Sequence, residues 1–323
     1  MSRARTSSTS DHDQALHGLK GRDLLTLQDL TSAEMLGLVE RTRLVKADPR
    51  GSGAALAGQT LAMIFEKPSL RTRVTFDVAM YQLGGHSVYL SPTEISMGKR
   101  ESVHDVAKNL ERMVQGIMIR TFAQSIVEEL ARAAEMPVIN ALTDANHPCQ
   151  GLADYVTLRE AKGEIKGLRI AWVGDGNNVL TSLIHGAALF GAEVAVATPP
   201  GYEPPADVVA WARTRESQTG VRVTLSHDPR EAVERADAVY TDTWTSMGQE
   251  AEAAERRRLF TPYQVNESLF ARAKSDAIFL HCLPAHRGEE VTDAVIDSPR
   301  SVVFDQAENR LHAQKAVLVA LMG

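Results

Sequence analysis

The chain has 323 residues, of which 44% are hydrophobic and 24% are charged, and these values are ordinary for a folded globular protein. At roughly 150 residues per domain, this length predicts two domains. The formal net charge of −6, from 35 Lys and Arg against 41 Asp and Glu, argues against a nucleic-acid coat protein, which requires a basic surface. No apolar run reaches the roughly 18 residues that a membrane-spanning helix requires.

The cysteines and the N-terminus bear on location. Cys149 and Cys282 lie too far apart in the sequence for a disulfide framework or a compact metal knuckle, and we expect a cytoplasmic protein. Residues 1–13 are polar, rich in Ser and Thr, and lack the apolar stretch of a secretory signal. We expect residues 1–20 to form a disordered tail.

Short apolar runs alternate with stretches of helical periodicity along the rest of the chain. In the first half, strands are predicted at 61–65, 86–90, 116–120 and 137–140, and helices at 70–83, 102–113, 124–135 and 150–166. In the second half, strands are predicted at 168–173, 192–198, 221–225, 237–242, 276–281 and 301–305, and helices at 178–190, 205–218, 229–235, 263–274 and 306–322.

Strands that alternate with helices form parallel sheets covered on both faces. The sequence therefore predicts an α/β protein with two doubly wound parallel-sheet domains. We expect the active site in the cleft between them, because ligands of open α/β sheets bind at the carboxyl ends of the strands. The predicted domains are 21–155, on which the C-terminal helix 306–323 packs back, and 156–305.

The first polar motif, Ser69-Leu70-Arg71-Thr72-Arg73, follows the strand at 61–65 and opens a helix. Ser69 is a typical N-cap, and the free N–H groups of the first turn, with Arg71 and Thr72, form a potential anion site. A capped helix with surface arginines is the alternative, and the spacing does not separate the two.

Arg120 ends an otherwise apolar strand. Burying a guanidinium requires an anionic partner, which favours a functional role. His147 and Gln150 lie where a loop opens the next helix; His147 could polarise a carbonyl group, and Gln150 could donate an amide hydrogen bond. A polar loop without such a role is equally consistent with their spacing.

The segment Gly174-Asp175-Gly176-Asn177-Asn178 follows the strand at 168–173, where a dinucleotide-binding loop would lie. The third glycine of that motif is missing, and the next strand ends in Thr198-Pro199 rather than in the acidic residue that would hold a ribose. We therefore favour a loop that offers side chains, Asn178 above all, and keep an NAD-dependent dehydrogenase as an alternative.

Three further candidates follow. The segment 242–248 comes after a strand, where Asp242 could pair with a ligand ammonium and Gly248 could permit loop movement; a mobile surface loop is the alternative. Cys282 follows another strand, either as a reactive thiol or as a small buried residue. Arg310 is predicted to open the last helix as a further anion contact.

These residues together favour one site for a dianionic phosphate, in the first half, and another for a cationic, amino-bearing partner, in the second half. Phosphoryl transfer fits this pattern poorly, because no P-loop is present.

Five motifs in this order resemble the ornithine carbamoyltransferases: SLRTR at 69–73, HPCQ at 147–150, GDGNN at 174–178, DTWTSMG at 242–248 and HCLP at 281–284. The resemblance runs from about Lys20 to the C-terminus. SLRTR and HPCQ are typical of all carbamoyltransferases, whereas DTWTSMG and HCLP indicate ornithine as the acceptor.

The resemblance implies transfer of a carbamoyl group from carbamoyl phosphate to the δ-amine of L-ornithine in arginine metabolism, without a metal or another cofactor. It implies a homotrimer, or a multiple of trimers, with sites at subunit interfaces. The implied carbamoyl phosphate site is Ser69, Leu70, Arg71, Thr72, Arg120, His147, Gln150, Cys282, Leu283 and Arg310. The implied ornithine site is Asn178, Asp242, Ser246 and Met247. The implied catalytic residues are Cys282, as proton acceptor, Arg120 and His147.

Two positions depart from the family pattern. Leu70 replaces a threonine of the usual Ser-Thr-Arg-Thr; it can contribute through its backbone N–H, although N-acetylornithine-type relatives also favour Leu. In the segment 94–102, Ser96 stands where many ornithine enzymes have His or Gln, and Ser96 followed by Lys99 is similar to the aspartate-using branch.

Several alternatives stay open. The same transfer could act on N-acetylornithine, putrescine or aspartate, although Asp242 favours an acceptor with an α-ammonium. The chain could instead be a non-catalytic binding subunit, which the intact Arg71, His147 and Cys282 oppose. Both an anabolic and a catabolic role are compatible with the sequence.

Overall fold

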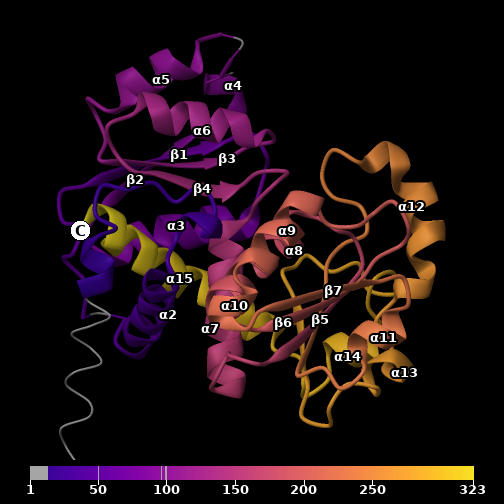
Figure 1. Ribbon diagram of the computed structural model, residues 1–323. Coiled ribbons are helices and arrows are strands. Elements are labelled where there is room, and N and C mark those ends of the chain that lie inside the picture. The colour runs from indigo at the N-terminus through magenta and orange to yellow at the C-terminus, as the bar shows by residue number, and fades with distance from the viewer. Residues whose placement is uncertain (1–13, 50, 96, 99) are drawn as a thin grey trace, which may run out of the picture. The chain divides into compact units, whose positions relative to one another are not determined.

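The computed structural model describes residues 14–49, 51–95, 97–98 and 100–323 (Figure 1). Ser96 and Lys99 lie outside these residues. The described strands are β1 (Thr60–Phe65), β2 (His86–Leu90), β3 (Gly116–Arg120), β4 (Val138–Leu142), β5 (Arg169–Val173), β6 (Glu193–Ala197), β7 (Arg222–Ser226), β8 (Ala238–Thr241) and β9 (Ile278–His281).

The described helices and 3-10 turns are η1 (Leu27–Asp29), α2 (Ser32–Ala47), α3 (Leu70–Gln82), α4 (Pro92–Ile95), α5 (Val103–Leu110), α6 (Gln124–Ala133), α7 (Pro148–Lys162), α8 (Asn178–Phe190), α9 (Ala206–Thr214), α10 (Glu216–Thr219), α11 (Pro229–Val233), η2 (Glu250–Glu252), α12 (Ala253–Phe260), η3 (Thr261–Tyr263), α13 (Glu267–Phe270), α14 (Asp293–Ile296) and α15 (Val303–Met322).

Unit 1 contains the chain up to Val156 and from Glu308 onward. Its described strands pair in parallel in the order β2-β1-β3-β4. Helices α5 and α6 cover one face of this sheet, and α3 and α15 cover the other (Figure 1). Ile64 and Ile117 of the sheet share one buried apolar cluster with Leu130 of α6, so that burial of apolar surface joins the layers.

Unit 2 contains Thr157–Ala307. Its described strands are also parallel, in the order β7-β6-β5-β8-β9. Helices α8 and α9 lie on one face, and α11, α13 and α14 lie on the other (Figure 1). The second face buries Val173 and Phe279 of the sheet against Phe270 and Val295 of the helices.

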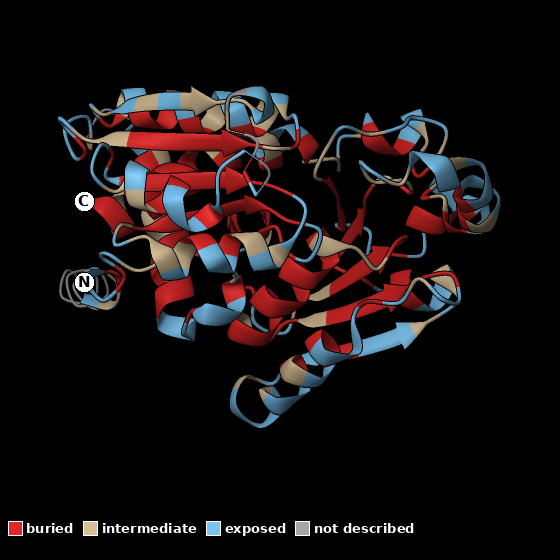
Figure 2. Ribbon diagram, turned by 90° about the horizontal axis from the view of Figure 1, so that it is seen from above, coloured by how far each residue is buried: buried red, intermediate tan, exposed pale blue. Residues whose placement is uncertain are grey.

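Burial along the strands explains their composition. The central strands of both sheets are buried over almost their whole length, whereas the edge strands β2 and β7 carry exposed residues (Figure 2). Strands that are covered on both faces contain near-continuous apolar runs, and the sequence of the central strands has this pattern. The predicted α/β class with two parallel-sheet units is confirmed.

The strand orders locate the chemically interesting edge of each sheet. Consecutive connections change direction between β1 and β3 in unit 1, and between β5 and β8 in unit 2. Ligands of such sheets bind beyond the carboxyl ends of the strands at this switch point. The segments that follow β1, β3, β5 and β8 contain most of the predicted site residues.

Two expectations need correction. The stretch 301–305 is not a strand: Ser301 makes one isolated bridge to Phe279, and α15 begins at Val303. The tail is not disordered over 14–20, because residues 14–17 are helical and Leu19 is fully buried; residues 1–13 lie outside the described chain. The chain passes from one unit to the other inside α7 and again inside α15.

Candidate active site

The first group of candidate residues lies where β1 gives way to α3. Ser69 is the N-cap of α3: its hydroxyl accepts a hydrogen bond from the Thr72 backbone N–H at 3.3 Å and donates one to the Thr72 hydroxyl at 3.0 Å. Thr72 Oγ1 also accepts a hydrogen bond from Arg310 Nη2 at 2.8 Å. The Leu70 side chain is 77% exposed, so that its backbone N–H is the group it offers at the helix N-terminus, where an anion can bind.

The two arginines of this motif lie in different surroundings. Arg71 is half-buried and close enough to His147 to act on its charge. Arg73 is exposed, and its guanidinium lies over the Tyr89 ring at 3.9 Å. Arg71 therefore belongs to the candidate site, and Arg73 packs on β2.

A buried histidine is the electrostatic centre of this group. His147 precedes α7, Arg120 ends β3 and Arg310 lies in α15, and all three side chains are buried. Burial, together with the positive charges of Arg310, Arg120 and Arg71, holds the pKa of His147 well below its usual 6.5. His147 is therefore neutral at pH 7 and can donate a hydrogen bond without adding charge.

One detail of this group differs from the sequence prediction. Arg310 does not open its helix, because α15 begins at Val303, about two turns earlier. One N–H of Gln150 Nε2 donates to Asp154 Oδ1 at 2.8 Å, and the amide group carries a second N–H. The Gln150 Oε1 atom is buried without a hydrogen-bond partner among the described residues, so that Gln150 offers an acceptor.

In unit 2, Asp242 follows β8 and is 8% exposed. Its carboxylate accepts three hydrogen bonds, from Asn177 Nδ2 at 2.7 Å, the Thr243 N–H at 2.8 Å and Cys282 Sγ at 3.0 Å. Three donors fix a carboxylate and leave it about one lone pair for an ammonium group. The sequence prediction missed Asn177, although its place directly before α8 is the signal of an N-cap.

The other predicted ornithine residues lie in more open surroundings. Asn178 is the first residue of α8 and is half-buried. Ser246 bonds inside its own loop, where its N–H donates to Gln249 Oε1 at 3.1 Å, and Met247 is 41% exposed. The structure thus brings Asp242 and Cys282 together, while Ser246 and Met247 form the outer part of the loop.

Arg256 anchors this loop from α12, a role that no pattern in the local sequence predicts. Its side chain is buried, its Nε donates to the Trp244 backbone oxygen at 2.5 Å, and its Nη2 pairs with Asp175. Burial raises the pKa of Asp175 to about 6, even though Arg256 lowers it. The run Arg256–Arg258 contains one buried and two exposed arginines, and nothing in the run itself distinguishes them.

The dinucleotide alternative is overturned within unit 2. The Gly176 N–H donates to the Tyr202 backbone oxygen at 2.9 Å, and a Cβ atom at Gly176 would lie 2.4 Å from the backbone carbon of Glu203. The chain itself therefore covers the place of a pyrophosphate. The Asn177 side chain also takes the first N–H groups of α8, which a dinucleotide would require.

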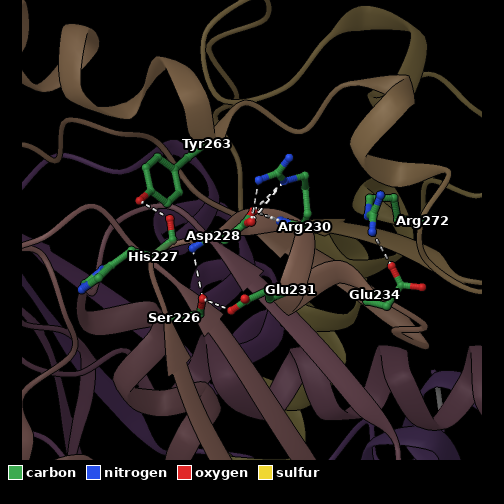
Figure 3. A network of polar contacts seen from close by, with 8 residues as sticks. All are labelled: Ser226, His227, Asp228, Arg230, Glu231, Glu234, Tyr263 and Arg272. Carbon is green, nitrogen blue, oxygen red and sulfur yellow. Dashed lines mark hydrogen bonds and ion pairs between the residues drawn. The ribbon is translucent and has the colours of Figure 1, made fainter.

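A network of polar contacts occupies the ends of β6 and β7 (Figure 3). The Tyr263 hydroxyl lies 2.7 Å from the His227 backbone oxygen and 3.0 Å from that of Thr198. The Ser226 hydroxyl donates to Glu231 Oε2 at 2.5 Å and accepts from the Asp228 N–H at 3.0 Å. Backbone and side chains satisfy one another here, and we assign this network a structural role.

A metal could be considered at the ends of β8 and β9, where ligand atoms of Asp242, His281 and Cys282 lie within 4.8 Å of one another. However, His281 Nδ1 accepts the Leu283 N–H at 2.9 Å, and His281 Nε2 lies 3.0 Å from Glu290 Oε1. Both ring nitrogens are thus engaged, and the donor set does not fit a metal without rearrangement.

Comparison with known proteins agrees with this geometry. The family model described as the aspartate/ornithine carbamoyltransferase carbamoyl-P binding domain matches residues 22–160, and the Asp/Orn binding domain of the same family matches residues 166–321. The chain is 55% identical to an ornithine carbamoyltransferase of Pyrococcus horikoshii, over 94% of this chain and 97% of that protein.

Similar values hold for Pyrococcus furiosus. Its anabolic ornithine carbamoyltransferase is 54% identical, over 94% of this chain and 98% of that protein. The solved structure of ornithine carbamoyltransferase from this organism superposes with a TM-score of 0.92 and the same two coverages. The matches span both units and agree with the five motifs. The chain therefore belongs to the aspartate/ornithine carbamoyltransferase family.

Proposed function

We propose that this chain transfers the carbamoyl group of carbamoyl phosphate to the δ-amine of L-ornithine and releases L-citrulline and phosphate. The observation that carries the proposal is the contact between the buried Asp242, which follows β8, and the half-buried Cys282, which follows β9, with Sγ 3.0 Å from Oδ1. The names of relatives that are 54–55% identical support ornithine as the acceptor.

Carbamoyl phosphate is proposed to bind the residue group of unit 1. The phosphate lies at the first turn of α3, where N–H groups and guanidinium groups neutralise it. His147 donates to the carbonyl oxygen, and Gln150 Oε1 accepts from the NH₂ group. The full proposed set is Ser69, Leu70, Arg71, Thr72, Arg120, His147, Gln150 and Arg310, with Cys282 and Leu283 from unit 2.

Ornithine is proposed to bind Asn178, Asp242, Ser246 and Met247. An alkylammonium has a pKa of about 10.4, so that little amine is nucleophilic at neutral pH. Asp242 and Cys282 are proposed to orient the amine. The thiol proton of Cys282 passes to the Asp242 carboxylate, to which it is already hydrogen-bonded, and the resulting thiolate takes the proton of the amine. The neutral nitrogen forms a bond to the carbamoyl carbon, and the bond from this carbon to the bridging oxygen breaks.

Charge development decides what the other groups do. Negative charge grows on the carbonyl oxygen and then on the leaving phosphate, and the donors Arg120 and His147 stabilise it. Carbamoyl phosphate is already an activated acyl donor, so the transfer requires no cofactor on chemical grounds. Holding both substrates in place supplies the rest of the acceleration.

A homotrimer is proposed as the assembly. Leu70, Val74 and Tyr81 are 77%, 50% and 82% exposed, and their spacing places them on one side of α3. The neighbouring β2 is one of the two edge strands of its sheet. An exposed apolar surface beside an unpaired edge is typical of a protein interface.

An anabolic role is proposed from the name of the Pyrococcus furiosus relative. A cytoplasmic location is proposed from the two free cysteines. No helix among the described residues is long and apolar enough to span a membrane.

The experiment is a comparison of acceptors. Product formation from carbamoyl phosphate is measured with L-ornithine, N-acetylornithine, putrescine and aspartate, without added metal. A large preference for L-ornithine is the expected result. A preference for another amine would overturn the assignment of Asp242 and the loop after it, and no product with any amine would favour a non-catalytic binding subunit.

A further inference from the structure

We propose that the buried pair His281 and Glu290 positions the backbone of Cys282 and Leu283 for the transfer reaction. His281 is the last residue of β9, and Glu290 lies nine residues further along the chain. Neither is predicted to contact a substrate, so that both are positioning residues. The inference rests on the proposed function and deepens it.

The hydrogen bonds of His281 define its protonation. Both side chains of the pair are fully buried, and His281 Nε2 lies 3.0 Å from Glu290 Oε1. The Leu283 backbone N–H donates to His281 Nδ1 at 2.9 Å. An atom that accepts a hydrogen bond carries no proton. The ring is therefore neutral, and its single proton lies on Nε2, facing the carboxylate of Glu290.

Glu290 is itself held in place. Its Oε1 accepts a second hydrogen bond, from the His286 backbone N–H at 2.6 Å, and its backbone oxygen accepts one from the Val265 N–H at 2.9 Å. With two donors directed at one oxygen, Glu290 presents an acceptor to His281 and selects the Nε2–H tautomer. The other tautomer would direct a proton from Nδ1 against the Leu283 N–H.

The tautomer of His281 acts on the loop that follows β9. Leu283 has φ of 59°, a left-handed conformation that a leucine rarely adopts and that its surroundings must stabilise. The hydrogen bond to His281 Nδ1 is made by the N–H of this residue. Cys282, directly before it, donates its thiol proton to Asp242 Oδ1. The tautomer of His281 thus sets the backbone that carries the proposed proton acceptor.

The same pair could act on stability alone, as a buried polar contact. Burial of a carboxylate is weak support for a stabilising role, because its desolvation offsets the attraction of its hydrogen bonds. The two accounts make different predictions for substitutions that remove different atoms of the histidine ring.

The first test compares His281→Asn with His281→Gln. The Asn side-chain oxygen can replace Nδ1 as acceptor for the Leu283 N–H but does not reach Glu290, whereas Gln reaches Glu290 and has no acceptor at the Nδ1 position. We expect His281→Gln to lower kcat for citrulline formation by about 10–100-fold, and His281→Asn to stay within about threefold of the unchanged protein. Equal kcat values for the two folded variants would overturn the proposal.

A second pair serves if the histidine variants do not fold. Glu290→Gln keeps an acceptor for both donors, and Glu290→Leu does not. We expect kcat within about threefold of the unchanged protein for Glu290→Gln and at least about tenfold lower for Glu290→Leu. A folded Glu290→Gln with kcat as low as that of Glu290→Leu would show that charge, and not the tautomer, matters. The control is Glu289→Gln, a half-buried neighbour that pairs with Arg257, with unchanged kcat expected.

A readout besides activity separates this inference from the proposed function. The rate of alkylation of Cys282 by iodoacetamide reports the setting of its thiol, since the other cysteine, Cys149, is 1% exposed. His281→Gln should change this rate by at least about threefold, and His281→Asn should not. Absence of citrulline formation by the unchanged protein would refute the function, whereas equal alkylation rates in the two variants would refute the positioning role.

Discussion

At the scale of single residues, His147 combines a buried ring with three nearby guanidinium groups, which keep it neutral. A neutral donor next to a carbonyl oxygen stabilises the charge that develops there. We expect His147→Ala to lower kcat by about 10²–10³-fold, and His147→Asn, which retains a neutral amide donor, to lower it less. Steady-state citrulline formation with both substrates saturating measures this.

The pH dependence gives an independent check of the same residue. Because the pKa of His147 lies well below 6.5, the ring does not titrate between pH 6.5 and 8. The pH profile of kcat should therefore keep its shape in His147→Asn across this window. A fall in kcat with a midpoint near pH 6.5 that is present in the unchanged protein and absent in His147→Asn would contradict the account.

The two cysteines provide a matched comparison. Cys282 donates its thiol proton to Asp242 and, once that proton has passed to the carboxylate, is proposed to take the proton of the amine. Cys149 is buried, donates to the Asn140 backbone oxygen at 3.6 Å, and has its pKa raised to about 12 by burial. We expect Cys282→Ala to lower kcat by at least about tenfold with little change in the KM for carbamoyl phosphate. Cys149→Ala is the control and should leave kcat unchanged; a Cys282→Ala variant with full turnover would refute the role.

At the scale of elements, α12 is connected to the loop 242–248 through one buried arginine. Arg256→Met removes the bond to the Trp244 backbone oxygen and leaves Asp175 buried without its cation. We expect the KM for ornithine to rise at least about tenfold, since a lost hydrogen bond to a charged group costs about 1.5–3 kcal/mol. The KM for carbamoyl phosphate should change less than about twofold.

The neighbouring Arg257 is the control for this prediction. It pairs with Glu289 and its side chain is 59% exposed, so that Arg257→Met should leave both KM values unchanged. An Arg256→Met protein that binds ornithine as well as Arg257→Met does would show that α12 does not hold the loop.

Helix α8 contains a group that links stability to pH. His185 is 2% exposed, neither ring nitrogen has a hydrogen-bond partner among the described residues, and its ring meets that of Trp211 edge-on at 5.1 Å. Burial lowers the pKa of His185 to about 4. The unfolded chain takes up a proton near pH 6.5 that the folded chain takes up only near pH 4, so that this group destabilises the fold as the pH falls.

The expected loss is about 2.5 kcal/mol in the free energy of unfolding between pH 7.5 and pH 4.5. His185→Leu should abolish this part of the pH dependence, which urea denaturation at the two pH values measures. The exposed His104 provides the control, because the His104→Gln variant should keep the same loss of stability between the two pH values. An equal loss in His185→Leu and in the unchanged protein would show that other groups cause the acid sensitivity.

Regular elements could be predicted where local pattern and burial agree. The strands β1 to β9 were found within about two residues because each is an apolar run between helical stretches. A strand was wrongly predicted at 301–305, because the β-branched residues of this stretch favour a strand. In the structure Val303 is buried and Phe304 is 70% exposed as the first residues of α15, so that tertiary packing overrides local propensity.

At the scale of the whole molecule, the rule that places ligands at strand ends identifies the candidate residues from the sequence alone. Their partners could not be found in this way. Asn177, Arg256 and Glu290 act through contacts with residues 9 to 81 positions away along the chain. Such contacts depend on packing, and no local spacing encodes them. The helix α12 could likewise not be predicted, because half of its residues are charged and they show no apolar periodicity.

The central claim is that the residue groups of both units serve one transfer. A compound that joins the two substrates tests this claim. It is a phosphonate in which a CH₂ group replaces the bridging oxygen of carbamoyl phosphate, and its carbonyl carbon is bonded to the δ-nitrogen of ornithine. Because this compound contains the binding groups of both substrates, the protein should bind it far more tightly than it binds either substrate alone.

The measurement is calorimetric titration of this phosphonate into the unchanged protein, Arg71→Met and Asp242→Asn. We expect the Kd to rise at least about tenfold in each variant, because each loses a charge-assisted contact. A Kd no lower than that of carbamoyl phosphate in the unchanged protein, or a rise in only one of the two variants, would contradict the account.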